Sequence, residues 1–176
     1  MEVVSRRSGP TPRARRLSFA TERAYLEEVT RRVCRSLGSA ACGVWLSGSA
    51  ALADFAADRS DLDVQALSAT RVRFAARAKL AAALDHEVLP CPARGLEFVL
   101  YALGDLREPA GPAFQLNLNT GSAPVRRVSS DPGDDPRFWF VVDVAIARQR
   151  GVALAGPPAA AVFPVLPRAT RRRFPG

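Results

Sequence analysis

The sequence predicts an α/β (α+β) domain in which a mixed β-sheet of four or five strands is flanked by helices. Three observations support this prediction. Apolar residues repeat at helical spacing in some segments and at strand spacing in others, Gly, Ser and Pro separate these segments, and 48% of the 176 residues are hydrophobic. A chain of this length and composition can bury one ordinary core. One domain is therefore expected, over residues 18–167.

The first predicted elements are a helix and a strand. Residues 21–37 carry apolar side chains at three- and four-residue steps between a suitable N-cap and a glycine, which predicts an amphipathic helix. Residues 42–46 form a short apolar run that stops at Ser47-Gly48-Ser49. This pattern predicts a buried strand that enters a tight turn, and a short helix is expected over residues 50–55.

Further elements follow from the same patterns. Residues 61–67 alternate polar and apolar side chains, as a strand with one covered face does. The alanine-rich residues 71–84 predict a helix. Two more strands are expected over residues 96–101 and 114–119, and residues 138–150 have helical period with a glycine as the stop.

The formal net charge of +8 is concentrated at the two ends of the chain. Five arginines and one glutamate lie within the first 16 residues, four more arginines lie from residue 168 onward, and the stretch between is neutral. Residues 1–17 and 168–176 are predicted to be disordered basic segments, because arginine clusters at chain ends are more often solvated than docked. Nucleic-acid binding is therefore the less favoured interpretation of the charge.

Several classes of site are excluded by composition. Cys34, Cys42 and Cys91 are odd in number and lack metal-ligand spacing, so neither a disulfide framework nor a zinc site is predicted. His86 is the only histidine, so acid–base chemistry is expected to use carboxylates. No segment approaches the ~18 apolar residues of a membrane span. A cytoplasmic protein with no membrane partner is expected.

Asp61 and Asp63 form the first candidate motif. Two residues apart on a strand, their side chains point to the same face, separated by roughly 6.6 Å of strand rise. Two such carboxylates can share one Mg²⁺, which prefers oxygen ligands and keeps positions for water and phosphate. The alternative is that Asp61 caps a turn after Ser60 while Asp63 is a surface charge.

The Ser47-Gly48-Ser49 turn is the second candidate. It ends a predicted strand and begins a predicted helix, so backbone N–H groups converge there and favour a phosphate. Gly48 would allow close approach of the backbone, and Ser49 could bond a terminal phosphate group. A Gly-Ser pair is also common in ordinary turns.

Glu97 is the third candidate, a carboxylate in an otherwise apolar strand. Burial of this charge is costly unless it meets a metal or a partner. If it points inward, Glu97 could take the proton from an attacking hydroxyl. If it points outward, it is a solvated charge on a half-exposed strand.

Together these motifs resemble the nucleotidyltransferase superfamily that includes DNA polymerase β. The closer resemblance is to the streptomycin/spectinomycin-type aminoglycoside adenylyltransferases, from about residue 25 to residue 163. The segments that carry it are Leu46-Ser47-Gly48-Ser49-Ala50, Arg59-Ser60-Asp61-Leu62-Asp63-Val64, Leu96-Glu97-Phe98, Asp143-Val144-Ala145-Ile146-Ala147-Arg148, Val152-Ala153-Leu154-Ala155-Gly156-Pro157 and Val162-Phe163.

The resemblance implies a role for each motif. It implies that Asp61 and Asp63 bind Mg²⁺, that Gly48 and Ser49 contact the triphosphate, and that Glu97 is the catalytic base. ATP would donate AMP to a hydroxyl of a cationic, aminoglycoside-like small molecule, and pyrophosphate would leave. This is the antibiotic-resistance type of reaction.

Other residues are weaker candidates. Asp143 is a tentative substrate-binding residue, although a solvated helical aspartate fits the pattern equally well. Ser60 could help to hold phosphate, or it could only cap its turn. Trp45 and Trp139 have apolar neighbours and are expected in the core.

The end of the chain departs from the family pattern. The resemblance implies a helical C-terminal domain after the Gly-Pro segment, and residues 168–176 do not resemble its start. A truncated chain is therefore expected. The alternatives are an inactive remnant that binds nucleotide, a module that binds nucleic acid, and an antitoxin-like, partner-binding nucleotidyltransferase.

Overall fold

The computed structural model describes residues 19–52, 55–108, 110–122 and 126–166. The basic segments predicted over residues 1–17 and 168–176 lie outside the described residues. The helices are α1 (Phe19–Leu37), α2 (Gly48–Ala51), α3 (Phe74–Leu84), α4 (Arg137–Arg150) and α5 (Ala159–Val162). The strands are β1 (Ala41–Leu46), β2 (Leu62–Ser68), β3 (Gly95–Ala102), β4 (Phe114–Gly121), β5 (Arg127–Ser129) and β6 (Val152–Ala155).

The described strands form one mixed sheet in the order β5-β4-β3-β2-β1-β6. Strands β2 and β3 are parallel, and the other neighbouring pairs are antiparallel. The α/β class and the mixed sheet are confirmed, but the sheet has six strands rather than four or five. The two unpredicted strands, β5 and β6, lie at the edges and have three and four residues, too few for a strand period to stand out.

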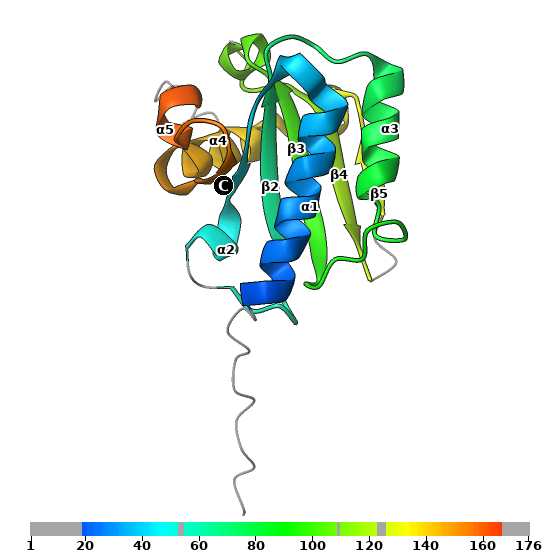
Figure 1. Ribbon diagram of the computed structural model, residues 1–176. Coiled ribbons are helices and arrows are strands. Elements are labelled where there is room, and N and C mark those ends of the chain that lie inside the picture. Colours follow the sequence, from blue (N-terminus) through cyan, green and yellow to red (C-terminus); the bar gives the residue numbers. More distant parts are fainter. Residues whose placement is uncertain (1–18, 53–54, 109, 123–125, 167–176) are drawn as a thin grey trace, which may run out of the picture.

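Helices cover both faces of the sheet (Figure 1). Helices α1 and α3 pack on one face, where Val29 and Val33 of α1 meet Leu62 and Phe98 in a continuous core. Helices α4 and α5 pack on the other face, over a second cluster that includes Trp45 and Tyr101. The alternation of side chains along each strand therefore assigns successive residues to different cores.

Some local predictions need correction. The helix expected over residues 50–55 is the shorter α2, which starts at Gly48. The strand expected from Asp61 begins at Leu62. Trp45 is fully buried, but Trp139 is 56% exposed, because α4 turns the next residue, Phe140, toward the sheet and leaves Trp139 stacked beside Phe138.

The two faces differ in how far they are covered near the start of β2 and β3. On the α4 side, Gln65 of β2 and Val99 of β3 are buried. Two residues earlier on each strand, on the same face, Asp63 is half-buried and Glu97 is exposed. The beginnings of these two parallel strands thus emerge from beneath α4 and are open to solvent.

Phe163, just after α5, ties the end of the described chain to the sheet. It is 1% exposed, and its ring meets Trp45 edge-on with centroids 5.1 Å apart. We expect Phe163→Ala to lower the free energy of unfolding by ~3–5 kcal/mol, because it leaves a cavity beside Trp45. Urea unfolding measures this. Phe74→Ala is the control, since Phe74 is 66% exposed; equal losses in both variants would contradict the packing described.

Candidate active site

The sheet register places polar residues from three strands in one row. Asp63 of β2 pairs with Glu97 of β3, and Glu97 pairs with Asn119 of β4. Residues paired across neighbouring strands have their side chains on the same face. The two carboxylates therefore stand side by side on the face that α4 covers only in part.

Gly48 brings the turn between β1 and α2 against this row. The Ser47 N–H donates to the Asp63 carbonyl oxygen at 2.8 Å, which extends the β1–β2 pairing into the turn. Gly48 then adopts a φ of +62°, and a Cβ at this position would overlap the Asp63 carboxylate. Only glycine combines this backbone conformation with such close approach.

Helix α4 lies against this row of polar residues. Asp143 lines a cavity of about 50 Å³ together with Gly48, Asp63 and Glu97. The helix is held there by buried Gln65, whose Nε2 donates to the Asp143 carbonyl oxygen at 3.2 Å and to Ser47 Oγ at 3.4 Å. One side chain therefore links β2, the Gly48 turn and α4.

Asp61 lies in an adjoining cavity of about 80 Å³, which Glu97 also lines. Its Oδ2 is 4.0 Å from an Nη1 atom of Arg94. Because Asp61 precedes β2, it does not share the regular strand position of Asp63. Glu97 lines both cavities, and the charge of Asp61 contributes to the raised pKa of Asp63.

The carboxylates raise one another's pKa. Burial raises the pKa of Asp63 from 3.8 to about 7, and the neighbouring charges of Glu97 and Asp143 add to the rise. Burial and Glu97 raise the pKa of Asp143 to about 6. The pKa of Glu97 is also raised, by loss of water around it and then by Asp61, although solvent still reaches this side chain.

This donor set fits a divalent cation that arrives with phosphate. Among the described residues, no group of three or more His, Cys, Asp and Glu side chains is arranged as a ready-made metal site. Mg²⁺ needs only one or two carboxylates when phosphate oxygens and water supply the other ligands. The Asp63 carboxylate, which is repelled by the charges of Glu97, Asp143 and Asp61, would be stabilised by such a cation.

The structure thus brings together Gly48, Asp63, Glu97 and Asp143, with Asp61 beside them. Ser60 does not line either cavity. Its Oγ accepts a hydrogen bond from the Ala56 N–H at 3.2 Å and closes a turn. Ser49 lies within α2, one residue beyond Gly48.

Sequence reasoning missed Gln65 and Arg94. Gln65 had a visible signal, since it continues the polar positions of Asp61 and Asp63 along the alternating pattern of β2. Arg94 follows a bend after Cys91 and carries no pattern of its own, so only its contact with Asp61 identifies it.

Comparison with known proteins supports the fold. No protein-family model matches the chain, and no curated protein sequence matches it. Among solved structures, the chain is similar to spectinomycin adenyltransferase AAD(9) from Enterococcus faecialis, solved with ATP and spectinomycin. The TM-score is 0.64 at 13% sequence identity, and the match covers 86% of this chain and 63% of that one. The chain therefore has a nucleotidyltransferase-like fold and spans less than two thirds of the length of this structural neighbour.

Proposed function

We propose that this protein is a Mg²⁺-dependent nucleotidyltransferase that transfers AMP from ATP to a hydroxyl of a cationic, aminoglycoside-like small molecule. The observation that carries the proposal is the placement of Asp63 and Glu97 side by side on parallel strands, with Gly48 against Asp63. The fold similarity to an adenyltransferase that binds ATP and spectinomycin supports the same reaction class.

Each group has a defined task in this proposal. Asp61 and Asp63 hold Mg²⁺, which would neutralise triphosphate charge when it is bound. The backbone at Gly48 and the Ser49 side chain receive the phosphates, with Ser60 behind them. Asp143 adds negative charge that attracts a cationic acceptor.

Glu97 acts as the general base. It takes the proton from the acceptor hydroxyl while that oxygen bonds to the α-phosphorus of ATP, and the bond to the β-phosphate oxygen breaks to release pyrophosphate. Its raised pKa suits this task, because a base whose pKa lies closer to neutrality accepts a proton more readily. Because solvent reaches the Glu97 side chain, an acceptor molecule can approach it.

The test is pyrophosphate release by the purified full chain with Mg²⁺-ATP and a panel of aminoglycosides. We expect release that depends on one acceptor or a narrow group of acceptors. Binding of ATP without release for any acceptor would contradict the proposal and favour the nucleotide-binding remnant. Binding to nucleic acid that does not need ATP and weakens steeply with salt would favour a module that binds nucleic acid.

The ligand-free protein should lose stability as the pH rises from about 4 to about 7. The folded-state pKa of Asp63 is about 7 against an ordinary 3.8, so the folded chain binds more protons than the unfolded chain in this window. Stability is therefore greatest below the window and falls as the carboxylates ionise. Thermal unfolding against pH measures this, with EDTA present.

Asp63→Asn is the control for the pH experiment, and its unfolding temperature should vary less across the window. Mg²⁺ added at pH 8 should stabilise the native chain and leave Asp63→Asn nearly unchanged. A flat native profile would show that burial and the neighbouring carboxylates do not raise the pKa of Asp63 as the structure indicates.

A further inference from the structure

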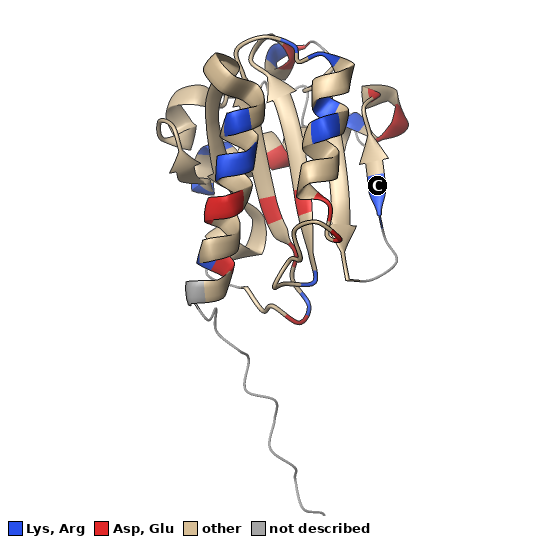
Figure 2. Ribbon diagram, turned by 45° about the vertical axis from the view of Figure 1, so that its right-hand side comes forward, with Lys and Arg blue, Asp and Glu red and all other residues tan. Residues whose placement is uncertain are grey.

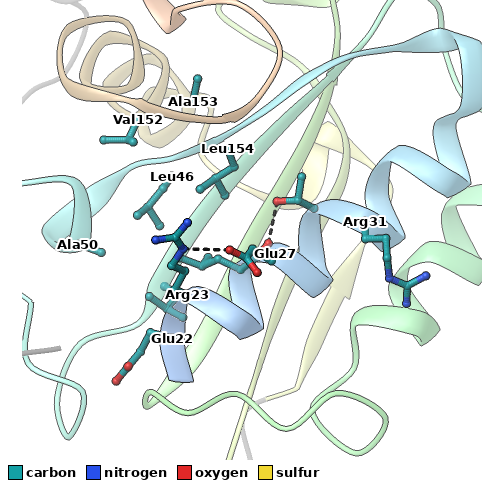
Figure 3. Close-up of a pocket in the computed structure, with 12 residues that line it drawn as sticks. Glu22, Arg23, Glu27, Arg31, Leu46, Ala50, Val152, Ala153 and Leu154 are labelled. Carbon is teal, nitrogen blue, oxygen red and sulfur yellow. Dashed lines mark hydrogen bonds and ion pairs between the residues drawn. The ribbon is translucent and has the colours of Figure 1, made fainter. Parts of the chain in front are cut away.

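An apolar groove lies on the sheet face opposite the carboxylates, between α1 and the β1–β6 edge (Figure 3). Its volume is about 640 Å³, far larger than either cavity at the candidate active site. It shares no lining residue with those cavities. The groove is therefore a separate feature, within the 300–1,000 Å³ typical of small-molecule sites.

The aliphatic walls of the groove come from five elements. Leu26 belongs to α1, Leu46 to β1, Ala50 to α2, Leu62 to β2 and Leu154 to β6. Strand β6 is the edge of the sheet, and Leu154 is only partly buried. An elongated apolar group would gain contact with Leu26, Leu46 and Leu154, whereas Leu62 is fully buried beneath them.

Glu22 lines one end of this groove and is the polar feature that defines its chemistry. Figure 3 shows Glu22 at the end opposite Val152. Glu22 is only 5% exposed, and its Oε2 is buried without a hydrogen-bond partner. Its position in the first turn of α1 is favourable for an acidic residue, but leaves this oxygen unsatisfied, which is costly in an apolar setting.

The arginines of the groove are bound to other carboxylates. Arg23 Nε donates to Glu27 Oε1 at 3.0 Å, and Arg31 Nε donates to Glu28 Oε2 at 2.6 Å. Neither of these hydrogen bonds involves Glu22. The buried negative charge at the end of the groove therefore remains available to a ligand.

We propose that the groove binds an organic cation with an elongated apolar body. The protonated amine lies against Glu22, and the apolar chain runs along Leu26, Leu46 and Leu154. An anion is disfavoured by the carboxylate, and a neutral apolar molecule leaves Glu22 Oε2 unpaired. This ligand site is additional to the proposed transferase site and does not depend on its activity.

The test is isothermal titration of the full chain with decylammonium, decanol and decanoate, each below its micelle concentration. The native chain should bind one decylammonium at least tenfold more tightly than decanol, and decanoate more weakly still. Glu22→Gln should abolish the preference for decylammonium over decanol. Glu87→Gln is the matched control, since Glu87 is exposed and does not line the groove, and it should retain the preference.

Two further variants separate this site from the other one. Leu154→Trp fills the groove and should weaken both decylammonium and decanol, whereas Asp63→Asn should bind both like the native chain. If Leu154→Trp does not fold, the Glu22→Gln comparison still decides. No saturable binding to the native chain, or an unchanged preference in Glu22→Gln, would overturn the proposal, and neither outcome would affect the pyrophosphate-release test.

Discussion

Asp63→Asn and Glu97→Gln are each expected to lower acceptor-dependent pyrophosphate release by about 10³-fold. Asp63 is the carboxylate that contacts the Gly48 turn, and Glu97 is its partner on the neighbouring parallel strand. Loss of a positioned general base costs about 10²–10⁴-fold. Loss of Asp63 removes a proposed ligand of the Mg²⁺ that would neutralise the triphosphate, a stabilisation worth several kcal/mol. Both substitutions keep the shape of the side chain and remove only its charge.

Initial-rate measurements with saturating Mg²⁺-ATP test this expectation. Asp58→Asn is the control, because Asp58 is exposed and lies outside both cavities of the candidate site. The two site variants should remain folded. Without Mg²⁺ at neutral pH, Asp63→Asn should be more stable than the native chain, since it removes a largely buried charge and its repulsion from Glu97 and Asp143. A loss of less than tenfold in either site variant would remove that residue from the proposed mechanism.

Gly48→Ala is expected to reduce the same reaction by on the order of 10²-fold, although no charged group is changed. The added methyl group would overlap the Asp63 carboxylate, so that the carboxylate or the turn must move. Displacement of a reactive group by about 1 Å can cost roughly 10²-fold in rate. The variant also carries the strain of a positive φ at a residue with a Cβ.

Two other glycines separate the causes of this effect. Gly38 has a φ of +56° and nothing within 4 Å of an added Cβ, so Gly38→Ala carries backbone strain alone. Gly104 has neither a positive φ nor any atom within 4 Å of an added Cβ. We expect Gly38→Ala to lose about 1 kcal/mol of stability with full activity, and Gly104→Ala to resemble the native chain in rate. Equal activity in Gly48→Ala and Gly38→Ala would show that contact with Asp63 is not needed.

The parts of this fold that could be predicted from sequence are those in which one segment carries its own pattern. Helix α1 shows its buried stripe through residues such as Val29 and Val33, and β2 shows the alternation of a strand. The edge strands β5 and β6 could not be predicted in the same way, because they owe their conformation to pairing with β4 and β1.

The same distinction applies to the candidate site. Asp63 and Glu97 could each be selected from local sequence. They are 34 positions apart in the chain, and their adjacency depends on the register between β2 and β3. The approach of Asp143 depends on the packing of α4 against the sheet through residues such as Phe140 and Val144, with the Gln65 hydrogen bond to the Asp143 carbonyl oxygen added to it. Asp61 and Asp63 were predicted together as ligands of Mg²⁺, and this stays a prediction; Asp61 lies just before the strand, with Oδ2 4.0 Å from Arg94 Nη1.

The parallel pairing of β2 and β3 has a consequence for how this protein can vary. The spacing between Asp63 and Glu97 is set by main-chain hydrogen bonding across the sheet, while residues 87–90 of the connecting segment lie between α3 and β3 and are mostly solvent-exposed. We expect insertions at the exposed positions of this connection to leave the two carboxylates in place. Evolution and protein engineers alike therefore have a place to add new recognition elements while the chemistry stays where it is.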